Sequence, residues 1–501
     1  MKSIYFLLFI LSTFSTIAQI KTTENRIEIE LKDGYTNEEV YSFGDQGFIL
    51  TSNAEKQVDG QVELHFQHYS TDLSFVDEQI YELRRGFHEV RNYVTNEDLY
   101  RLYMDRMGKF ILLQYHIKTG MITSLDGDFE HSYLVNAIEI AENHLMLIGS
   151  YKRKLEIINL EISNGNIQRS PIVIEGVHPK RMFFNNLQYL EQTHAFYTSI
   201  RGFPSKKISN LYIQQYDIYG NLTHSSVLYQ DLNRKFMNSS AAPLNEEELL
   251  ITGTYSNGSG SASAGLYMAT TKDGAVNETN YYNFIDLENF LSYLPQKSQD
   301  RIVKKKERYA EKGKELSYSY LMAVHDIIPC DEDFLFLGEA YYPTYRTESR
   351  TTYVNGKPTT TYYQVFDGYQ YTHALLAKFD KEGKLIWSQC FKMYPKYKPY
   401  YVKRFIRVAG KSQSGIKLVF ADGKYIYGKE FDFDGNVISD KTSSEINGSK
   451  DNDQVKNSYS DIVYWYDHFF LSYGFQRIKN TKDEDVKRKR NVLFINKIMF
   501  E

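Results

Sequence analysis

The chain has 501 residues, with 59 Lys and Arg against 63 Asp and Glu and a formal net charge of −4. This near-neutral balance predicts no large basic face, so nucleic acid is not an expected partner. With only two cysteines, disulfides are not expected to stabilise the fold, while 43 tyrosines and 31 phenylalanines favour β-strands.

Residues 1–18 have the pattern of a secretory signal peptide. Lys2 gives a positive start, and the apolar run from Ile4 to Leu11 is too short to span a bilayer. Thr16-Ile17-Ala18 fits a cleavage site, with a buried N-terminal strand as the alternative. We therefore expect export through the Sec pathway to the periplasm, the outer surface or the medium. The mature chain, 19–501, has a formal charge of −5 and no transmembrane segment, and no lipid anchor is expected because the first cysteine is Cys330.

One unit of about four strands recurs along the mature chain. Its second strand is an apolar run, and eight copies are found. They begin at Phe48, Leu99, Leu145, Ala195, Leu249, Phe334, Ile416 and Phe469. Its third strand ends in a tight turn, often Asn-Gly or Asp-Gly, whose glycine supplies a positive φ. Six such turns are marked by glycines 120, 165, 220, 274, 383 and 435.

Two insertions interrupt the repeat. Residues 284–318 are expected to be helical, because Leu287, Leu291 and Leu294 share one helix face and the charged run from Arg301 to Lys314 is typical of a solvated helix. Residues 341–371 are rich in Tyr and Thr around Asn355-Gly356, which predicts a long β-hairpin. Without these insertions the repeat averages ~52 residues, close to the length of a four-stranded propeller blade.

The last unit lacks one strand. Its three strands are expected at Tyr459 to Trp465, His468 to Phe475 and Val492 to Met499. The alternating segment from Arg26 to Leu31 has no unit of its own, so we expect it to pair with the last strand and close a ring. The predicted fold is an all-β, single-domain β-propeller over 19–501 with about eight four-stranded blades, seven being the alternative.

The segment from Ala374 to Gln389, ALLAKFDKEGKLIWSQ, resembles the third-to-fourth-strand signature of PQQ-like and related bacterial propellers, the superfamily pattern that also covers WD40-like proteins. Asp380 would end a strand, Gly383 would form the turn and Trp387 would lie on the outer strand. The pattern also resembles exported bacterial propeller proteins, mostly of unknown function. Only Trp387 and Trp465 occur, so the sequence departs from the quinone enzymes and no quinone or other cofactor is expected.

No local catalytic motif is present, and no metal site or catalytic residue is predicted. His325-Asp326 at a strand end is interpreted as a satisfied pair that alternatively lines a channel, and Asp432-x-Asp434-Gly435 as a turn in place of a calcium loop. Cys330 and Cys390 fall on strands too far apart in one blade for a disulfide, so both thiols are expected to be free and buried.

The leading functional hypothesis is a non-catalytic binding or scaffolding propeller of the bacterial cell envelope. Its expected partner is a protein or glycan of the envelope, and the propeller itself is expected to be a monomer. The alternative is a polysaccharide-active or other hydrolytic enzyme with its site at the ring axis, because propeller enzymes assemble carboxylates from several blades. A large, amphipathic tyrosine surface suits glycan or protein recognition. The predicted ligand-binding tyrosines are Tyr345, Tyr353, Tyr362, Tyr363, Tyr369, Tyr371 and Tyr397.

Overall fold

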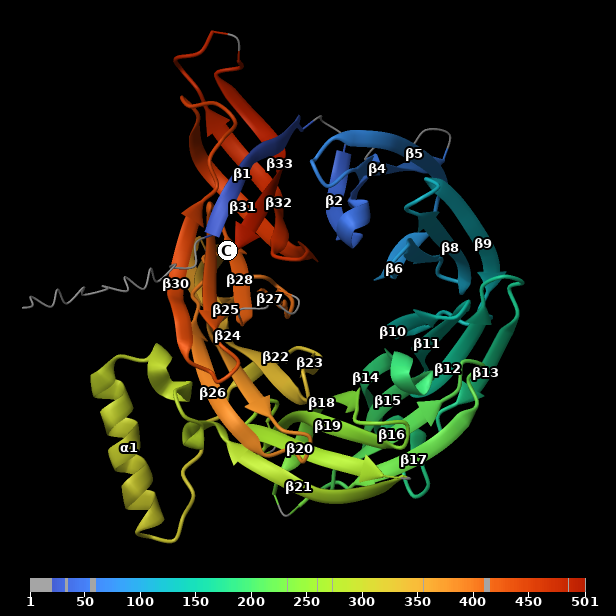
Figure 1. Cartoon of the computed structure of the whole chain (residues 1–501), viewed down its shortest axis with the longest axis vertical. Helices are drawn as coiled ribbons and strands as arrows, with labels where there is room; N and C mark the ends of the chain where they lie inside the picture. The colour runs from blue at the N-terminus through green and yellow to red at the C-terminus, as the bar shows by residue number, and fades with distance from the viewer. Residues whose placement is uncertain are drawn as a thin grey trace, which may run out of the picture.

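The computed structural model describes residues 20–31, 35–54, 60–231, 233–258, 260–272, 274–354, 356–409, 415–484 and 486–500; the expected signal peptide at 1–18 and Asn355 lie outside these ranges. The described strands form eight antiparallel sheets that follow one another around a ring (Figure 1). The predicted all-β propeller is confirmed, with eight blades and not seven.

The first four blades each hold four strands in chain order, the first strand being innermost. Blade 1 contains β2 (Tyr35–Ser42), β3 (Phe48–Ala54), β4 (Gln61–Tyr69) and β5 (Phe75–Arg84). Blade 2 contains β6 (His88–Val94), β7 (Asp98–Met104), β8 (Lys109–His116) and β9 (Met121–Asp128). Blade 3 contains β10 (Leu134–Ala141), β11 (His144–Tyr151), β12 (Lys154–Glu161) and β13 (Ile167–Pro171). Blade 4 contains β14 (Met182–Leu190), β15 (Ala195–Gly202), β16 (Asn210–Tyr216) and β17 (Leu222–Leu228).

The last four blades carry the variations. Blade 5 contains β18 (Lys235–Pro243), β19 (Glu248–Ser256), β20 (Gly265–Lys272) and β21 (Ala275–Asn283). In blade 6 the innermost strand is split, giving β22 (Leu321–Val324), β23 (Ile328–Cys330), β24 (Asp333–Val354), β25 (Lys357–Phe379) and β26 (Leu385–Lys392). Blade 7 contains β27 (Arg407–Val408), β28 (Ile416–Asp422), β29 (Tyr425–Phe431) and β30 (Val437–Glu445). Blade 8 contains β31 (Gln454–Tyr466), β32 (Phe469–Lys479), β33 (Lys489–Phe500) and, outermost, β1 (Ile20–Glu30).

The hydrophobic core is divided among the junctions between neighbouring blades. Each of the eight junctions holds its own cluster of buried side chains, including the junction between blades 8 and 1. The second strands are covered on both sheet faces by the adjacent blades, so they are apolar at consecutive positions, as in Phe48–Leu50. This explains why the second strands are unbroken apolar runs, whereas a half-exposed strand would alternate.

The repeat glycines have two roles in the structure. All six predicted turn glycines have positive φ, for example +75° at Gly383 and +84° at Gly435. Some of these turns also pack against the preceding blade: a Cβ on Gly435 would lie 2.6 Å from the Trp387 ring, whose Nε1 donates to the Phe433 carbonyl at 3.0 Å. At Gly435 the turn and the blade contact therefore both select glycine.

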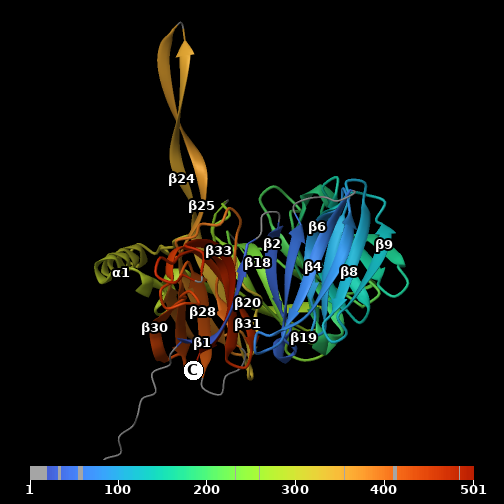
Figure 2. The same cartoon turned by 90° about the horizontal axis from the view of Figure 1, so that it is seen from above.

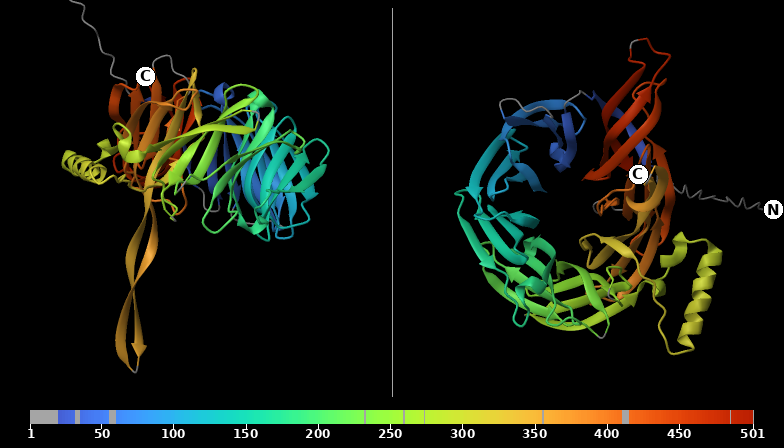
Figure 3. Two further views of the ribbon diagram at one scale, coloured as in Figure 1. Left: turned by 90° about the horizontal axis from the view of Figure 1, so that it is seen from below. Right: turned by 180° about the vertical axis from the view of Figure 1, so that it is seen from behind.

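The insertion at 284–318 differs from the expectation in its first half. The structure has two 3₁₀ turns, η4 (Phe284–Asp286) and η5 (Phe290–Tyr293), where the leucine spacing predicts an α-helix. Leu287 is buried and Leu291 packs with it against the junction of blades 5 and 6, so tertiary burial accounts for the spacing. The helix α1 (Gln296–Ala310) begins after Pro295 and lies exposed on the outside of the ring (Figure 3).

Short 3₁₀ turns also occur elsewhere, at η1 (Gly44–Gln46), η2 (Pro179–Arg181) and η3 (Glu191–Thr193).

Ring closure by the N-terminal strand is confirmed. β1 pairs antiparallel with β33, with Ile27 opposite Ile495 and Glu30 opposite Val492. Ile27 and Ile29 pack into the junction between blades 8 and 1. The same junction holds Trp465, whose Nε1 donates to the Gly47 carbonyl at 3.0 Å. The two ends of the chain therefore complete one blade together.

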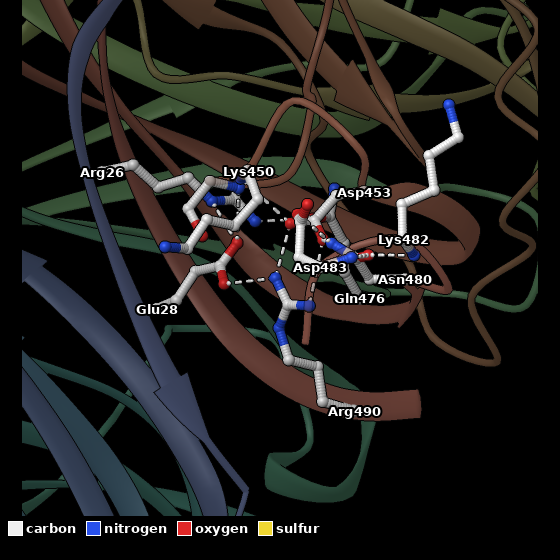
Figure 4. A network of polar contacts seen from close by, with 10 residues as sticks. Arg26, Glu28, Lys450, Asp453, Gln476, Asn480, Lys482, Asp483 and Arg490 are labelled. Atoms are coloured by element: carbon white, nitrogen blue, oxygen red, sulfur yellow. Dashed lines mark hydrogen bonds and ion pairs between the residues drawn. The ribbon is translucent and has the colours of Figure 1, made fainter. Parts of the chain in front are cut away.

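A buried polar network fastens β1 to blade 8 (Figure 4). Arg26 donates to Glu28 at 2.8 Å and to Gln476 at 2.6 Å. Arg490 bridges Glu28 at 3.2 Å and Asp453 at 3.0 Å, and the Asp453 side chain is fully buried. Burial opposes the charge on Asp453, but hydrogen bonds from Arg490 and Asn480 outweigh it and lower its pKa. These contacts link the N-terminal strand to segments more than 400 residues away.

Neither cysteine forms a disulfide, and both are buried, as predicted. Cys330 ends β23 and Cys390 lies on β26, on opposite sides of the two long central strands of blade 6. Burial raises the pKa of the Cys390 thiol to about 11, so it stays protonated and unreactive in the folded protein.

The Arg490→Met substitution is expected to lower the free energy of unfolding by about 3 kcal/mol, because it leaves the buried Asp453 carboxylate without its guanidinium. Chemical denaturation measures the change. Arg84→Met, which removes the exposed Arg84–Asp126 pair, is the matched control and should cost less than about 1 kcal/mol. Equal effects of the two substitutions would contradict a special role for the network.

Acid should weaken ring closure. The pKa values of Glu28 and Asp453 lie below their ordinary values in the folded protein, so their ionisation stabilises the fold above the unfolded-state pKa, about 4. That stabilisation is lost as pH falls through the lower, folded-state pKa. We expect Asp453→Asn to show a smaller loss of melting temperature than the parent between about pH 5 and pH 2. Parallel pH profiles would show that Asp453 is not one of the groups responsible.

The thiols provide a third test. A thiol reagent such as DTNB should titrate no cysteine in the native protein under non-reducing conditions and two after denaturation, since both side chains are buried. A denatured, non-reduced sample with no reactive thiol would indicate a Cys330–Cys390 bridge and contradict the blade assignment.

Candidate functional site

The most distinctive feature outside the ring is a long two-stranded ribbon on blade 6. β24 and β25 have 22 and 23 residues, whereas the second and third strands of blades 1 to 5 have 7 to 9. Their lower parts are the central strands of blade 6, and their upper parts continue beyond the ring (Figure 2). We call residues 345–366 the arm. Ten residues of β24 from Tyr345 to Val354 span about 34 Å.

A bulge separates the arm from the blade. Between the pairs Pro343–Tyr369 and Tyr345–Phe366, β25 has two residues where β24 has only Thr344. One of the two is Gly368, with φ +87°, and a Cβ there would lie 2.5 Å from the Lys398 carbonyl. The bulge increases the local twist, and Gly368 allows the loop from 394 to 403 to pack against the base of the arm.

The loop and the arm base are joined by polar contacts as well. The Tyr369 N–H donates to the Pro399 carbonyl at 2.9 Å, and the Thr344 hydroxyl donates to the Gly368 carbonyl at 2.8 Å. Lys398 Nζ lies 3.1 Å from Asp367 Oδ2. The position from which the arm leaves the ring is therefore fixed by the folded blade.

The strand register divides the arm into two faces of different chemistry. One face carries no charged side chain; its members are Tyr345, Thr347, Ser349, Thr351, Tyr353, Pro358, Thr360, Tyr362, Gln364 and Phe366. The other carries all the charged side chains of the arm, namely Arg346, Glu348, Arg350 and Lys357, together with Tyr363. Because side chains alternate along a strand, this separation follows directly from the sequence once the register is known.

Three predicted tyrosines lie on the uncharged face and are exposed. The exposed fractions are 60% for Tyr345, 75% for Tyr353 and 71% for Tyr362. Tyr363 lies on the charged face, where its hydroxyl donates to Glu348 at 3.3 Å. Within the described part of the chain, the rings of Tyr353 and Tyr362 stack on no other aromatic ring.

The other three predicted tyrosines are not exposed as expected, and Tyr371 is a clear correction. Tyr371 is 0% exposed, and its hydroxyl accepts from the Lys403 N–H at 2.8 Å. Burial raises its pKa. It belongs to the core of the junction between blades 6 and 7, so it cannot present its ring to a partner. Tyr369 and Tyr397 are half-buried against the same core.

A chain of aromatic contacts connects that core to the arm. Successive ring centroids are 4.8 to 6.1 Å apart through Phe405, Tyr371, Tyr341, Tyr369, Phe366 and Tyr345. Phe366 also contacts Tyr400 at 5.7 Å. Sequence reasoning missed Phe366, although its alternation with the tyrosines of the uncharged face was available as a signal. These contacts support the base of the arm and leave its outer half exposed.

The ring axis contains the charged groups that the enzyme alternative requires, but they are already paired. A shallow cavity of about 310 Å³ between β2 and β6 is lined by Glu39, Glu89 and Arg101, among others. Arg101 Nε donates to Glu89 at 3.0 Å, and the Tyr41 hydroxyl donates to Glu39. The two carboxylates of this cavity are thus held by neighbouring side chains.

One further carboxyl near the axis has a perturbed pKa. Burial raises the pKa of Glu139 on β10 to about 7, even though the Tyr93 hydroxyl donates to it at 2.9 Å. A carboxyl group with this pKa can serve as a general acid. Glu139 does not line the axial cavity between β2 and β6. The negative charge of Asp326 contributes to raising its pKa, but Asp326 is paired with Arg404 at 3.4 Å. Glycosidases typically use two carboxyl groups that flank the scissile bond.

The remaining candidates from the sequence have structural roles. His325 and Asp326 each have a different partner: His325 Nε2 lies 2.7 Å from the buried Glu339, which also accepts the Phe405 and Ile406 N–H groups, and Arg404 lies 3.4 Å from Asp326. Asp432 accepts N–H groups of its own turn from Asp434 and Asn436. Among the described residues, no group of three or more His, Cys, Asp or Glu is arranged to hold a metal ion. No helix in the described ranges is long and apolar enough to cross a membrane.

No model of a known protein family matches the chain, and no curated protein sequence matches it. Several solved structures resemble its fold. The β-propeller domain of the Trilobed protease from Pyrococcus furiosus is 8% identical, with a TM-score of 0.32 over 87% of this chain and 100% of that one. The dihydro-heme d1 dehydrogenase NirN is 9% identical, with a TM-score of 0.44 over 94% and 78%. A functionally unknown protein from Desulfotomaculum acetoxidans DSM 771 is 8% identical, with a TM-score of 0.36 over 76% and 95%. At these identities the likeness concerns the fold and carries no inference about activity.

Proposed function

We propose that this protein is a non-catalytic binding or scaffolding propeller of the bacterial cell envelope and that the arm is its recognition element. The observation that carries the proposal is the uncharged face of the arm, on which Tyr345, Tyr353 and Tyr362 are exposed. Tyrosine offers a large contact area, a polar tip and a small loss of conformational entropy on binding, which suits protein and glycan surfaces.

An architectural explanation for the tyrosines accounts for the base of the arm but not for its outer half. A two-stranded ribbon is marginally stable in water, so cross-strand side-chain contacts are needed. Thr351 and Thr360 supply such a contact at 3.0 Å, and Gln364 donates to Thr347 at 2.9 Å. Tyr353 and Tyr362 lie opposite Pro358 and Ser349. Their rings are therefore available for a partner.

The export that an envelope role requires is supported by the signal-peptide pattern of residues 1–18. The hydrolase alternative receives less support. The axial cavity is shallow, and Glu39 and Glu89 are engaged by Tyr41 and Arg101. Glu139 is the group to test if the purified protein hydrolyses a polysaccharide.

The arm is tested by removing two tyrosines from one face. Tyr353→Ser with Tyr362→Ser should weaken capture of an envelope partner by about 30-fold, the effect of losing a binding hot spot of about 2 kcal/mol. The melting temperature should be unchanged, because exposed substitutions alter stability by about 0.5 kcal/mol or less. The measurement is a quantitative pull-down from envelope extract.

Tyr229→Ser is the matched control, since it removes a tyrosine that is 74% exposed and lies after β17 of blade 4, outside the arm, and it should retain the partner. A second variant replaces residues 346–366 with a short Gly-Ser link. If that variant loses stability and retains every partner, the arm is architectural and the proposal fails.

A further inference from the structure

The face of the ring opposite the arm contains a groove of about 1020 Å³. It is formed by turns between first and second strands and between third and fourth strands in blades 4, 5 and 6. The arm instead extends the connection between a second and a third strand. In an antiparallel blade these two kinds of turn lie at opposite ends of the sheet, so the groove and the arm lie on opposite faces of the ring.

The groove combines apolar walls with an acidic rim. Its apolar side chains include Leu190, Leu244, Pro329 and Phe334. Its carboxylates are Glu191, Glu248, Glu278, Asp331, Glu332 and Glu382, against the two ammonium groups of Lys381 and Lys384. These lining residues have a net charge of −4. Only Glu248 forms an ion pair among the described residues, with Lys272 at 3.0 Å.

The outer part of the arm has the complementary chemistry. Residues 349–364 contain Arg350 and Lys357 and no acidic residue, which gives a net charge of +2. Within the described ranges neither side chain is in an ion pair. They lie on the opposite face of the ribbon from Tyr353 and Tyr362. The tip thus carries aromatic groups on one face and basic groups on the other, whereas the groove carries apolar and acidic ones.

The geometry of the molecule allows the arm of one copy to reach the groove of a second copy. The arm projects roughly along the ring axis (Figures 2 and 3). It belongs to blade 6, and the groove lies at the other end of blades 4 to 6. Moving a second copy along the ring axis therefore brings its arm tip toward the groove of the first. A groove of this volume has the size of a site for a drug-sized ligand, which is also enough for the tip of a hairpin.

We propose that the arm of one copy binds the acidic groove of a second copy, so that the protein associates head to tail. This inference rests on the proposed function, because it assigns a partner to the arm. The contact is heterologous, and such contacts form open chains or closed rings and are not limited to dimers. Since charge complementarity contributes, association should weaken as salt is raised from about 50 to 500 mM.

Two variants and their mixture test the proposal by sedimentation velocity at low salt. The arm variant carries Arg350→Glu and Lys357→Glu, which changes the charge of the outer arm to −2. The groove variant carries Glu278→Lys and Glu332→Lys, which makes the groove lining neutral. The parent should associate with increasing concentration, and each variant alone should associate at least about tenfold more weakly.

The mixture distinguishes this contact from general charge effects. The groove variant retains a native arm and the arm variant retains a native groove, so an equimolar mixture should form a 1:1 complex. Lys180→Glu with Arg181→Glu reverses two exposed positive charges elsewhere and should associate like the parent. Unchanged melting temperatures show that each variant is folded.

Three results would overturn the inference: a parent that stays monomeric at about 100 µM in low salt, association that neither variant weakens, or a mixture that remains monomeric. A monomeric parent whose tyrosine variant still loses an envelope partner would leave the proposed function standing and reject only self-association. If the tyrosine variant also retained every partner, both proposals would fail.

Discussion

The structure depends on the packing of each blade against two neighbours. A four-stranded sheet in this chain has apolar side chains on both faces of its inner strands, so it can bury them only between two other sheets. Because every blade needs two neighbours, the requirement is met for all of them only when the last sheet packs against the first. The cluster that joins Phe48 and Tyr69 of blade 1 to Trp465 and Ile495 of blade 8 is therefore needed by every other junction.

This constraint explains why the closing blade carries so many polar contacts. Blade 8 is the only described sheet built from both ends of the chain, and its outer strand β1 has no covalent turn linking it to β33. The Arg26–Glu28–Arg490–Asp453 network supplies the connection that a hairpin supplies in other blades. Buried charges are costly unless fully paired, and here each one has a partner from another segment of the sequence.

A closed ring also provides a rigid support for the arm. The arm is a continuation of strands whose register is set in the core of blade 6, so its direction is fixed by the blade rather than by a flexible loop. The bulge at Gly368 and the aromatic contacts of Tyr369 and Phe366 hold the base of the arm against the blade. Among the described residues, the outer half makes no contact between aromatic rings, which is the arrangement expected of a recognition element on a stable scaffold.

The sequence alone determined the local features: the strands, the tight turns, the eight units, the strand that closes the ring and the hairpin at 341–371. These follow from side-chain periodicity and from glycines that require positive φ, which are properties of short segments.

Tertiary structure decided the burial of each position. Tyr371 and Tyr362 lie in the same strand with the same chemistry, yet one is in a blade junction and the other is in solvent. The spacing of Leu287 and Leu291 reflects burial against blades 5 and 6 and not an α-helix. The groove is assembled from turns of three blades nearly 200 residues apart at their extremes, so only the folded ring brings its carboxylates together.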